Sequence, residues 1–107
     1  MCYTFWMKEL KVRLLMAWEA SLGLMGRKSP QAVFFTTRWG IHTFFVRFPI
    51  DIVILDEHNT VCLLKRALLP NRVFVWNPKY YRVIELPGGT IEKIKLKIGE
   101  KITLTFL

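Results

Sequence analysis

The feature that most constrains this chain is a series of short apolar segments, rich in β-branched and aromatic residues and separated by proline, glycine and asparagine. Segments of this kind between turn-forming residues are typical of β-strands. The sequence predicts strands at residues 8–14, 32–35, 43–48, 50–55, 61–64, 73–76, 81–86 and 102–106. Residues 56–59 have the composition of a turn, so the strands on either side of them are expected to form a hairpin.

One segment near the start of the chain has a different period. Apolar residues recur near helical spacing from Leu14 to Met25, and Gly23 supplies a stop signal. With the strands, this short helix predicts a mainly-β fold, a compact jelly-roll-like sandwich or closed barrel with one short helix near the N-terminus. Because no repeat or linker interrupts the pattern, residues 1–107 are expected to form a single domain.

Residues 93–98 alternate strictly between lysine and an apolar residue. In an extended chain the three lysines would share one face. The favoured interpretation is an edge strand whose lysines discourage edge-to-edge pairing with other sheets. The alternative is a basic stripe that binds an anionic partner.

The composition excludes several classes of protein. Hydrophobic residues make up 52% of the chain and the mean hydropathy is +0.27, which excludes a disordered tail or adaptor. Cys2 and Cys62 are too few for a disulfide framework or a zinc site of four cysteines. Gln31 is the only glutamine, whereas isoleucine, valine, lysine and arginine are plentiful, a balance that indicates a thermophile.

The sequence also bears on location. No apolar run approaches the roughly 20 residues of a membrane-spanning helix, and no signal-peptide cleavage pattern is present. We therefore expect a cytoplasmic protein that does not engage a membrane.

Four motifs, in order along the chain, carry a family resemblance. They are Gly-Leu-Met-Gly-Arg at 23–27, Phe-Pro-Ile-Asp-Ile-Val-Ile-Leu-Asp at 48–56, Val-Ile-Glu-Leu-Pro-Gly-Gly at 83–89 and Ile-Gly-Glu-Lys-Ile at 98–102. From about Val12 to its end, the chain resembles the domain of unknown function family 192. The resemblance implies a compact, mainly-β, jelly-roll-like domain with a small helix, and no established activity. Where the family often has aspartate after the late glycine, this chain has Glu100.

Asp51 is the ionisable residue that the sequence singles out. It lies within an apolar run, and on a strand it shares a face with Val53 and Leu55. Because an unpaired buried charge is expensive, Asp51 is predicted to be buried and bonded to an arginine or to at least two backbone amides. Arg27 and Arg47 are its natural partners, since a guanidinium binds a carboxylate in two-pronged fashion. This structural role is favoured over that of a ligand-binding or general-base carboxylate.

Three further positions carry ionisable side chains of interest. Glu85 precedes the turn-forming residues 87–89, so it is predicted to accept amide hydrogen bonds and fix that turn. Its alternative role is the second carboxylate of an acid/base pair with Asp51. His42 is a further candidate ligand-binding side chain. Asp, Glu and His at 56–58 do not predict a metal site, because metal ligands normally come from separate elements or from helical spacing.

The favoured function is a non-enzymatic binding or accessory domain, because no signature of a catalytic triad, a Cys-His pair or a phosphate loop is present. Its pocket would take a small polar or anionic ligand. The candidate lining residues are Arg27, His42, Arg47, Asp51 and Glu85. We expect no cofactor, and a monomer or a small homo-oligomer.

Two other classes of function compete with this one. The first is a hydrolase that uses the carboxylates of Asp51 and Glu85 with an arginine as electrostatic stabiliser. The second is a weak, non-specific nucleic-acid binder, indicated by the net charge of +8 and by Tyr80, Tyr81 and Arg82.

Overall fold

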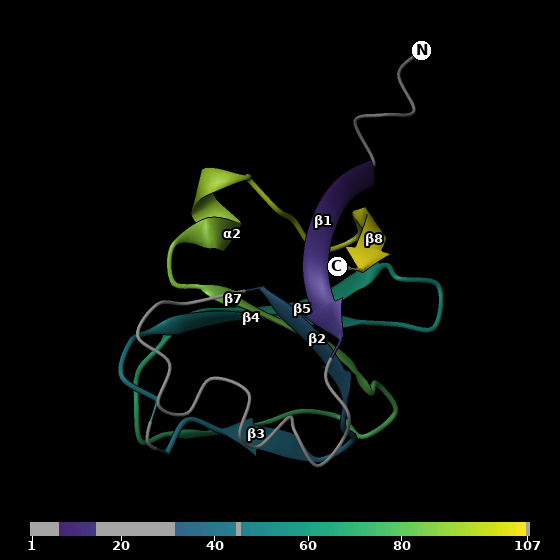
Figure 1. The fold of residues 1–107 in the computed structure, drawn as a ribbon. Helices are drawn as coiled ribbons and strands as arrows, with labels where there is room; N and C mark the ends of the chain where they lie inside the picture. Colours follow the sequence, from purple (N-terminus) through teal and green to yellow (C-terminus); the bar gives the residue numbers. More distant parts are fainter. Residues whose placement is uncertain (1–6, 15–31, 45, 107) are drawn as a thin grey trace.

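The computed structural model describes residues 7–14, 32–44 and 46–106 of the chain. In chain order, its elements are β1 (Met7–Leu14), β2 (Val33–Thr36), β3 (Gly40–His42), β4 (Ile50–Leu55), β5 (Val61–Leu68), β6 (Val73–Val75), β7 (Arg82–Pro87), α2 (Thr90–Lys93) and β8 (Lys101–Phe106). Six strands form one sheet in the order β5-β4-β7-β2-β1-β8, and β3 pairs with β6 in a separate two-stranded ribbon (Figure 1). The prediction of a mainly-β chain is confirmed.

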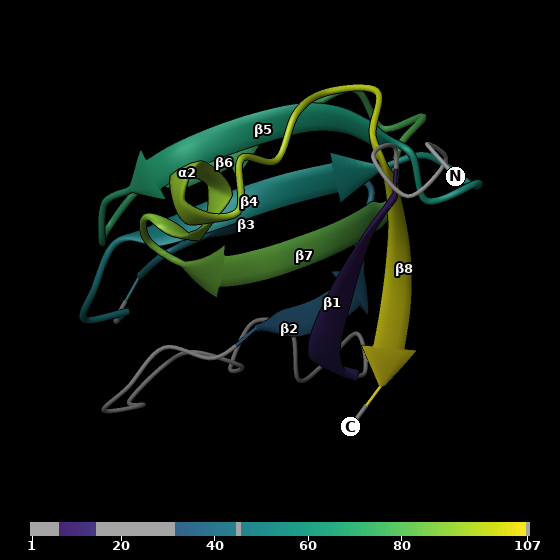
Figure 2. The same ribbon diagram turned by 90° about the horizontal axis from the view of Figure 1, so that it is seen from above.

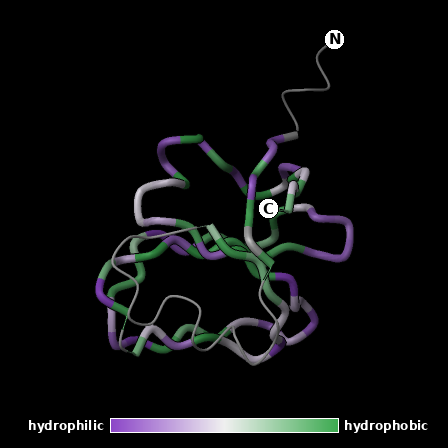
Figure 3. The backbone as a smooth tube through the Cα atoms, viewed as in Figure 1, coloured by the Kyte–Doolittle hydropathy of each residue, from purple (hydrophilic) through white to green (hydrophobic). Residues whose placement is uncertain are grey.

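The centre of the large sheet is covered on both faces, which explains why β4 reads as an almost continuous apolar run. On one face, Val53, Ile84 and other apolar residues pack with Ile91 of α2 to form the helix-side core. On the other face, Ile52, Phe35 and their neighbours pack with inward residues of β3 and β6 to form the ribbon-side core. Figure 1 shows α2 above the sheet and β3 below it, and Figure 3 shows the hydrophobic central strands between them.

The two ends of the strand order meet at one corner of the sheet. The amide of Val61 donates to the carbonyl of Glu100 at 2.8 Å, and the amide of Ile102 donates to the carbonyl of Asn59 at 2.8 Å. Figure 2 shows the start of β8 beside the start of β5. These bonds join β5 to β8, the two edge strands, so the sheet is curled. The predicted jelly-roll-like sandwich or closed barrel is not confirmed.

The predicted helix between Leu14 and Met25 lies, beyond Leu14, outside the described residues. The helix that the structure describes is α2, near the C-terminus, and the sequence did not predict it. Within the described residues, no helix combines the length and the apolar character needed to cross a membrane.

The predicted strand at 93–98 is wrong. The helix α2 ends at Lys93, and Lys95 has a φ of 55°, in the left-handed region, far from the dihedral angles of a regular strand. Ile94 and Leu96 pack against the helix-side core from this turn. The lysines of this segment are exposed, while the apolar residues between them, at 94 and 96, face the core. A helix end followed by a turn can therefore produce the same alternation of buried and exposed residues as a strand.

The predicted strand at 43–48 is also wrong, since the described residues of this segment contain no strand. Thr43 is fully buried, and its hydroxyl donates to the carbonyl of Leu69 at 2.7 Å. The same hydroxyl accepts the amide of Arg72 at 2.8 Å. Thr43 therefore ties the β5–β6 loop to the end of β3, instead of pairing with a neighbouring strand.

Candidate ligand-binding site

Asp51 is fully buried, and both of its carboxylate oxygens are bonded to backbone amides. Oδ1 accepts the amide of Ala67 at 2.9 Å, and Oδ2 accepts the amide of Ile91 at 2.8 Å. The prediction that Asp51 is buried and held by at least two amides is confirmed. Its partners are backbone groups of β5 and α2.

The local structure explains why these two amides need a carboxylate. Opposite Asp51, β5 contains two residues, Arg66 and Ala67, because the register shifts between Ile50 and Ile52. This is a β-bulge, and Ala67 has a φ of 50° that turns its amide out of the ladder. At α2, Gly89 occupies the N-cap and offers no side chain to accept the amides of the first turn. Asp51 supplies an acceptor to both positions and so joins three elements.

Glu85 lies on the opposite face of the sheet from Asp51. In the register between β4 and β7, Glu85 pairs with Ile52, whereas Asp51 pairs with Leu86. Since directly paired residues share a face, Glu85 belongs to the ribbon side and Asp51 to the helix side. Burial raises the pKa of Glu85 from 4.5 to about 8, so its carboxyl is mostly protonated at neutral pH.

The turn-fixing role predicted for Glu85 is wrong in the described part of the chain, where no amide of residues 87–91 donates to it. Gly88 instead donates to the carbonyl of Pro49 at 3.2 Å. Asp51 binds the amide of Ile91 just beyond this corner, so it performs the role that the sequence assigned to Glu85.

The predicted pocket residues are not brought together in the described part of the chain. Asp51 and Glu85 face opposite ways, so the two-carboxylate arrangement of the hydrolase alternative is absent there. Arg47 is exposed, and Arg27 lies outside the described residues. His42 is exposed on the ribbon, where its ring stacks on Phe44 with the centroids 5.0 Å apart.

A hollow of about 270 Å³ opens elsewhere, between the β4–β5 turn and the segment that leads into β7. Its lining combines acidic, basic and aromatic side chains, and we call it the polar hollow. It is lined by Leu55, Asp56, Glu57, His58, Lys79, Tyr80 and Tyr81. Two of the three nucleic-acid candidates, Tyr80 and Tyr81, therefore line a concave site.

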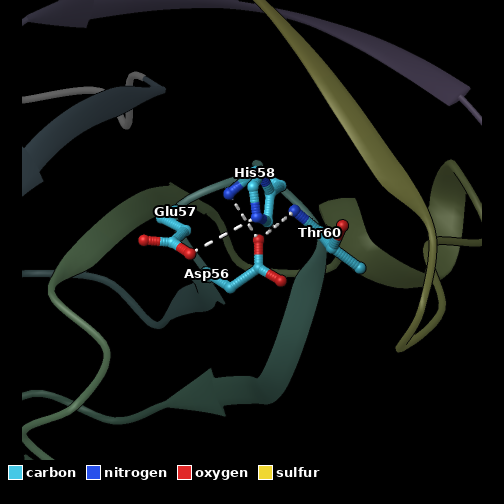
Figure 4. Close-up of polar contacts among 4 residues, drawn as sticks. All are labelled: Asp56, Glu57, His58 and Thr60. Atoms are coloured by element: carbon cyan, nitrogen blue, oxygen red, sulfur yellow. Dashed lines mark hydrogen bonds and ion pairs between the residues drawn. The ribbon is translucent and has the colours of Figure 1, made fainter.

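Both walls of the polar hollow are fixed by hydrogen bonds. On the turn side, Oδ1 of Asp56 accepts the amides of His58 at 2.8 Å and Thr60 at 2.9 Å (Figure 4). Oε1 of Glu57 lies 3.3 Å from Nε2 of His58, at the exposed tip of the same turn. On the other side, the indole nitrogen of Trp76 donates to the carbonyl of Tyr80 at 2.7 Å. The aromatic wall is thereby anchored to the ribbon-side core, against which Trp76 packs.

Cations accompany the aromatic rings around the polar hollow. The guanidinium of Arg38 lies 4.5 Å from the ring centroid of Tyr81, and the ammonium of Lys79 lies 5.8 Å from that of Tyr80. Arg82 is engaged elsewhere, because its Nε donates to Oδ1 of Asn59 at 2.9 Å and its guanidinium covers the ring of Phe34. Arg82 therefore has a structural role in joining β7 to the β4–β5 turn.

The thiol of Cys62 lies near this region and donates to the carbonyl of Thr60 at 3.5 Å. Burial raises its pKa, and the negative charge of Asp56 adds to that effect. A raised pKa keeps the thiol protonated, which is unfavourable for a nucleophile. Across the part of the chain that the structure describes, no three His, Cys, Asp or Glu side chains are grouped as metal ligands would be.

Sequence reasoning missed Lys79, Glu57 and the use of His58 in a concave site. The sequence did contain a signal for the turn side of this site, namely a run of polar residues directly after a fully buried strand. A buried strand holds such a turn in a fixed position, where its side chains can bind a ligand. What could not be read from the sequence was that residues 79–81, some twenty positions later, lie opposite this turn.

The fold is similar to those of two solved structures. One is a protein of unknown function from Novosphingobium aromaticivorans, with a TM-score of 0.71 and 17% identity over 89% of this chain and 71% of that one. The other is described as a putative transcription regulator from Sinorhizobium meliloti, with a TM-score of 0.72 and 19% identity over 84% of this chain and 78% of that one. At such identities the likeness concerns the fold alone.

Curated relatives come from thermophilic archaea, which fits the thermophile expectation. The UPF0127 protein PH1112 of Pyrococcus horikoshii is 34% identical over 90 residues, covering 78% of this chain and 77% of that protein. The UPF0127 protein PF1050 of Pyrococcus furiosus is 29% identical over 104 residues, covering 89% of each. The match to the UPF0127 protein of Thermococcus sibiricus is 39% identical, and spans 58% of this chain but only 40% of that protein.

The family profile described as "Uncharacterized ACR, COG1430" matches residues 16–104. This range contains the four motifs on which the resemblance was based. The chain therefore belongs to the domain of unknown function family 192 (DUF192).

Proposed function

We propose that this protein is a non-enzymatic binding domain that takes a small polar ligand in the polar hollow. The observation that supports the proposal is the lining of the hollow, which combines carboxylates, a lysine and two tyrosine rings on walls fixed by backbone hydrogen bonds. A site with rigid walls loses little conformational entropy when a ligand binds, so a small contact area suffices.

The lining favours a ligand that carries both signs of charge. Lys79 supplies a cation on one side, and Glu57 supplies a carboxylate on the other. Tyr80 and Tyr81 each add an aromatic ring and a hydroxyl group to the lining. A volume of about 270 Å³ limits the ligand to a small molecule, of the size and polarity of a free amino acid.

A binding role is favoured over catalysis because the candidate chemical groups are engaged or separated. Oδ1 of Asp56 is occupied by two amides, and the Cys62 thiol has a raised pKa. Asp51 and Glu85 project to opposite sides of the sheet. None of these arrangements provides the activated nucleophile or the paired acid and base of a hydrolase.

The nucleic-acid alternative has one supporting observation, which is the placement of Arg38 and Lys79 beside the rings of Tyr81 and Tyr80. Cations beside stacking aromatic residues are the usual means of holding single strands. However, Glu57 and its neighbour Asp56 line the same hollow and would repel phosphate groups. A nucleic acid bound here would therefore bind weakly and lose affinity steeply as the salt concentration rises.

The two functions can be separated by calorimetric titration of the intact chain with a panel of free amino acids and with single-stranded oligothymidylate. Lys79→Ala and Glu57→Gln should each weaken binding of the preferred amino acid, whereas Lys95→Ala, an exposed lysine on the α2 turn, should not. The proposal fails if no amino acid binds, or if the Lys95 control weakens binding as much as Lys79→Ala. Tight oligothymidylate binding that Glu57→Gln strengthens would favour the nucleic-acid function instead.

A further inference from the structure

A second hollow, of about 310 Å³, lies between the end of β5 and the start of β6. We propose that it binds an apolar chain that ends in an anionic head group, such as an alkyl carboxylate. We call it the cationic hollow, and its principal lining residues are Lys65, Leu68, Leu69, Arg72, Val73 and Phe74. This site is separate from the polar hollow and shares no residue with it.

The apolar part of the cationic hollow is unusually open to water. Leu68 is buried and Phe74 is half-buried, so they form a floor that is continuous with the ribbon-side core. Leu69 and Val73 also line the hollow, and their exposed fractions are 50% and 62%. Covering such side chains with an alkyl chain removes apolar surface from water, which is favourable in proportion to the area covered.

The charges at the cationic hollow have a single sign. Lys65 and Arg72 are exposed at its margin, and no acidic residue is among the described residues that line it. Asp51 lies opposite Ala67 on the neighbouring strand but projects to the helix side of the sheet, where it is bonded to two amides. Glu85 shares the ribbon side with Lys65, since both pair with Ile52. Burial keeps Glu85 mostly protonated at neutral pH, so it adds little negative charge near an incoming anion.

One wall of the cationic hollow is held in its shape by Thr43. The hydroxyl of this buried residue binds the carbonyl of Leu69 and the amide of Arg72, and the amide of Asn71 donates to the carbonyl of Thr43 at 2.9 Å. The loop that carries Arg72 is therefore preorganised before a ligand arrives. Preorganisation of this kind lowers the entropic cost of binding.

The same charges argue against a second copy of the chain as the occupant. A symmetric dimer through this face would bring Lys65 and Arg72 of each copy together, and each copy carries a net charge of +8. Like charges in contact oppose association. An anionic ligand reverses this balance, because its head group can pair with both cations.

The test is a titration of the intact chain with decanoate, decanol and decyltrimethylammonium, followed by calorimetry and by amide chemical shifts. Decanoate should bind and shift the amides of residues 65–74, with an affinity at least about fivefold above that of the other two probes. Replacing both Lys65 and Arg72 with glutamine should weaken decanoate binding about tenfold, because two partly exposed charge pairs are lost. Lys79→Ala, which alters only the polar hollow, should leave decanoate binding unchanged.

Other outcomes would overturn the proposal. Equal binding of decanol and decanoate would mean that the hollow recognises apolar chains without regard to charge. Binding to phosphatidylglycerol vesicles without binding of free decanoate would assign this face to a membrane surface. Concentration-dependent dimerisation that decanoate does not reverse would assign it to a second copy of the chain. An unchanged decanoate affinity in the Lys65 and Arg72 double variant would place the ligand elsewhere.

Discussion

Replacing Asp51 with alanine should destabilise the protein far more than replacing Asp56, although each carboxylate accepts two backbone amides at closely similar distances. The two residues differ mainly in burial, because Asp51 is fully buried whereas Asp56 lies in a partly exposed turn. In Asp51→Ala the amides of Ala67 and Ile91 lose their partner, and water cannot readily replace it. In Asp56→Ala, water can reach the freed amides.

The expected magnitudes follow from the two bonds that are lost. A hydrogen bond to a charged group contributes about 1.5–3 kcal/mol to stability, so Asp51→Ala should cost about 3–6 kcal/mol. Because Asp56 is only partly buried, Asp56→Ala should cost about 1 kcal/mol, the net value of an ordinary hydrogen bond. Since a small domain has only about 5–15 kcal/mol of stability, Asp51→Ala places folding itself at risk. Asp51→Asn keeps one acceptor and the shape of the side chain, so it should retain the fold at a cost of about 2–3 kcal/mol.

Urea denaturation of the parent and the three variants gives the free energies of unfolding by linear extrapolation. Amide hydrogen exchange adds a local measurement, and in Asp51→Asn at least one of the amides of Ala67 and Ile91 should lose more protection than the β7 amides. The reasoning is refuted if Asp51→Ala and Asp56→Ala have equal costs, or if the amides of Ala67 and Ile91 both remain fully protected in Asp51→Asn.

Three further predictions concern single residues. Because the folded-state pKa of Glu85 is raised from 4.5 to about 8, its contribution to stability is complete below pH 4.5 and is lost as the pH rises through about 8. Thermal melting from pH 4 to 9 should therefore show a decline that Glu85→Gln abolishes, and parallel curves for the two proteins would contradict this. Thr43→Val should cost about 1–3 kcal/mol in urea denaturation, because the partly buried amide of Arg72 loses its acceptor and the carbonyl of Leu69 loses its donor; a neutral result would mean that water reaches this loop. Gly40→Ala should cost about 1–3 kcal/mol, since its Cβ would lie 2.6 Å from the carbonyl oxygen of Phe74, and a variant with unchanged melting would show that the ribbon yields easily.

The sequence predicted six strands to within one residue at each end, among them the central strand β4 and the edge strand β8, but it ended the strand at 61–64 four residues short of the end of β5. The β4 sequence is rich in isoleucine and valine because both faces pack against apolar residues, and its only charge, Asp51, was read correctly as a buried, satisfied group. Apolar patterning failed where alternation had another cause, as at residues 93–98, where a turn buries Ile94 and Leu96. It also missed α2, which at four residues is too short to show a helical period.

The pairing of Asp51 with Glu85 failed for a reason that a single sequence cannot remedy. In an antiparallel pair, the register decides whether two residues on neighbouring strands share a face, and a shift of one position reverses the answer. Here Ile52, and not Asp51, pairs with Glu85. In the sequence, both carboxylates lie within apolar strands and cannot be told apart. The register places Asp51 on the helix side of the sheet and Glu85 on the ribbon side. The polar hollow was missed for the related reason that its two walls are far apart in sequence.

The parallel pairing of β1 with β8 bears on how the chain folds. Met7 lies beside Lys101 and Val12 beside Phe106, so this contact joins segments more than ninety residues apart. Closing a loop of that length costs conformational entropy, and this cost must be met before the contact can stabilise the chain. Strands paired in this way are therefore expected to form late and to slow folding. During synthesis, β1 emerges from the ribosome long before its β8 partner exists. Until β8 is made, the edge of β1 that pairs with it has unpaired backbone groups. We therefore expect the chain to mispair with other strands most readily during synthesis, before the fold is complete.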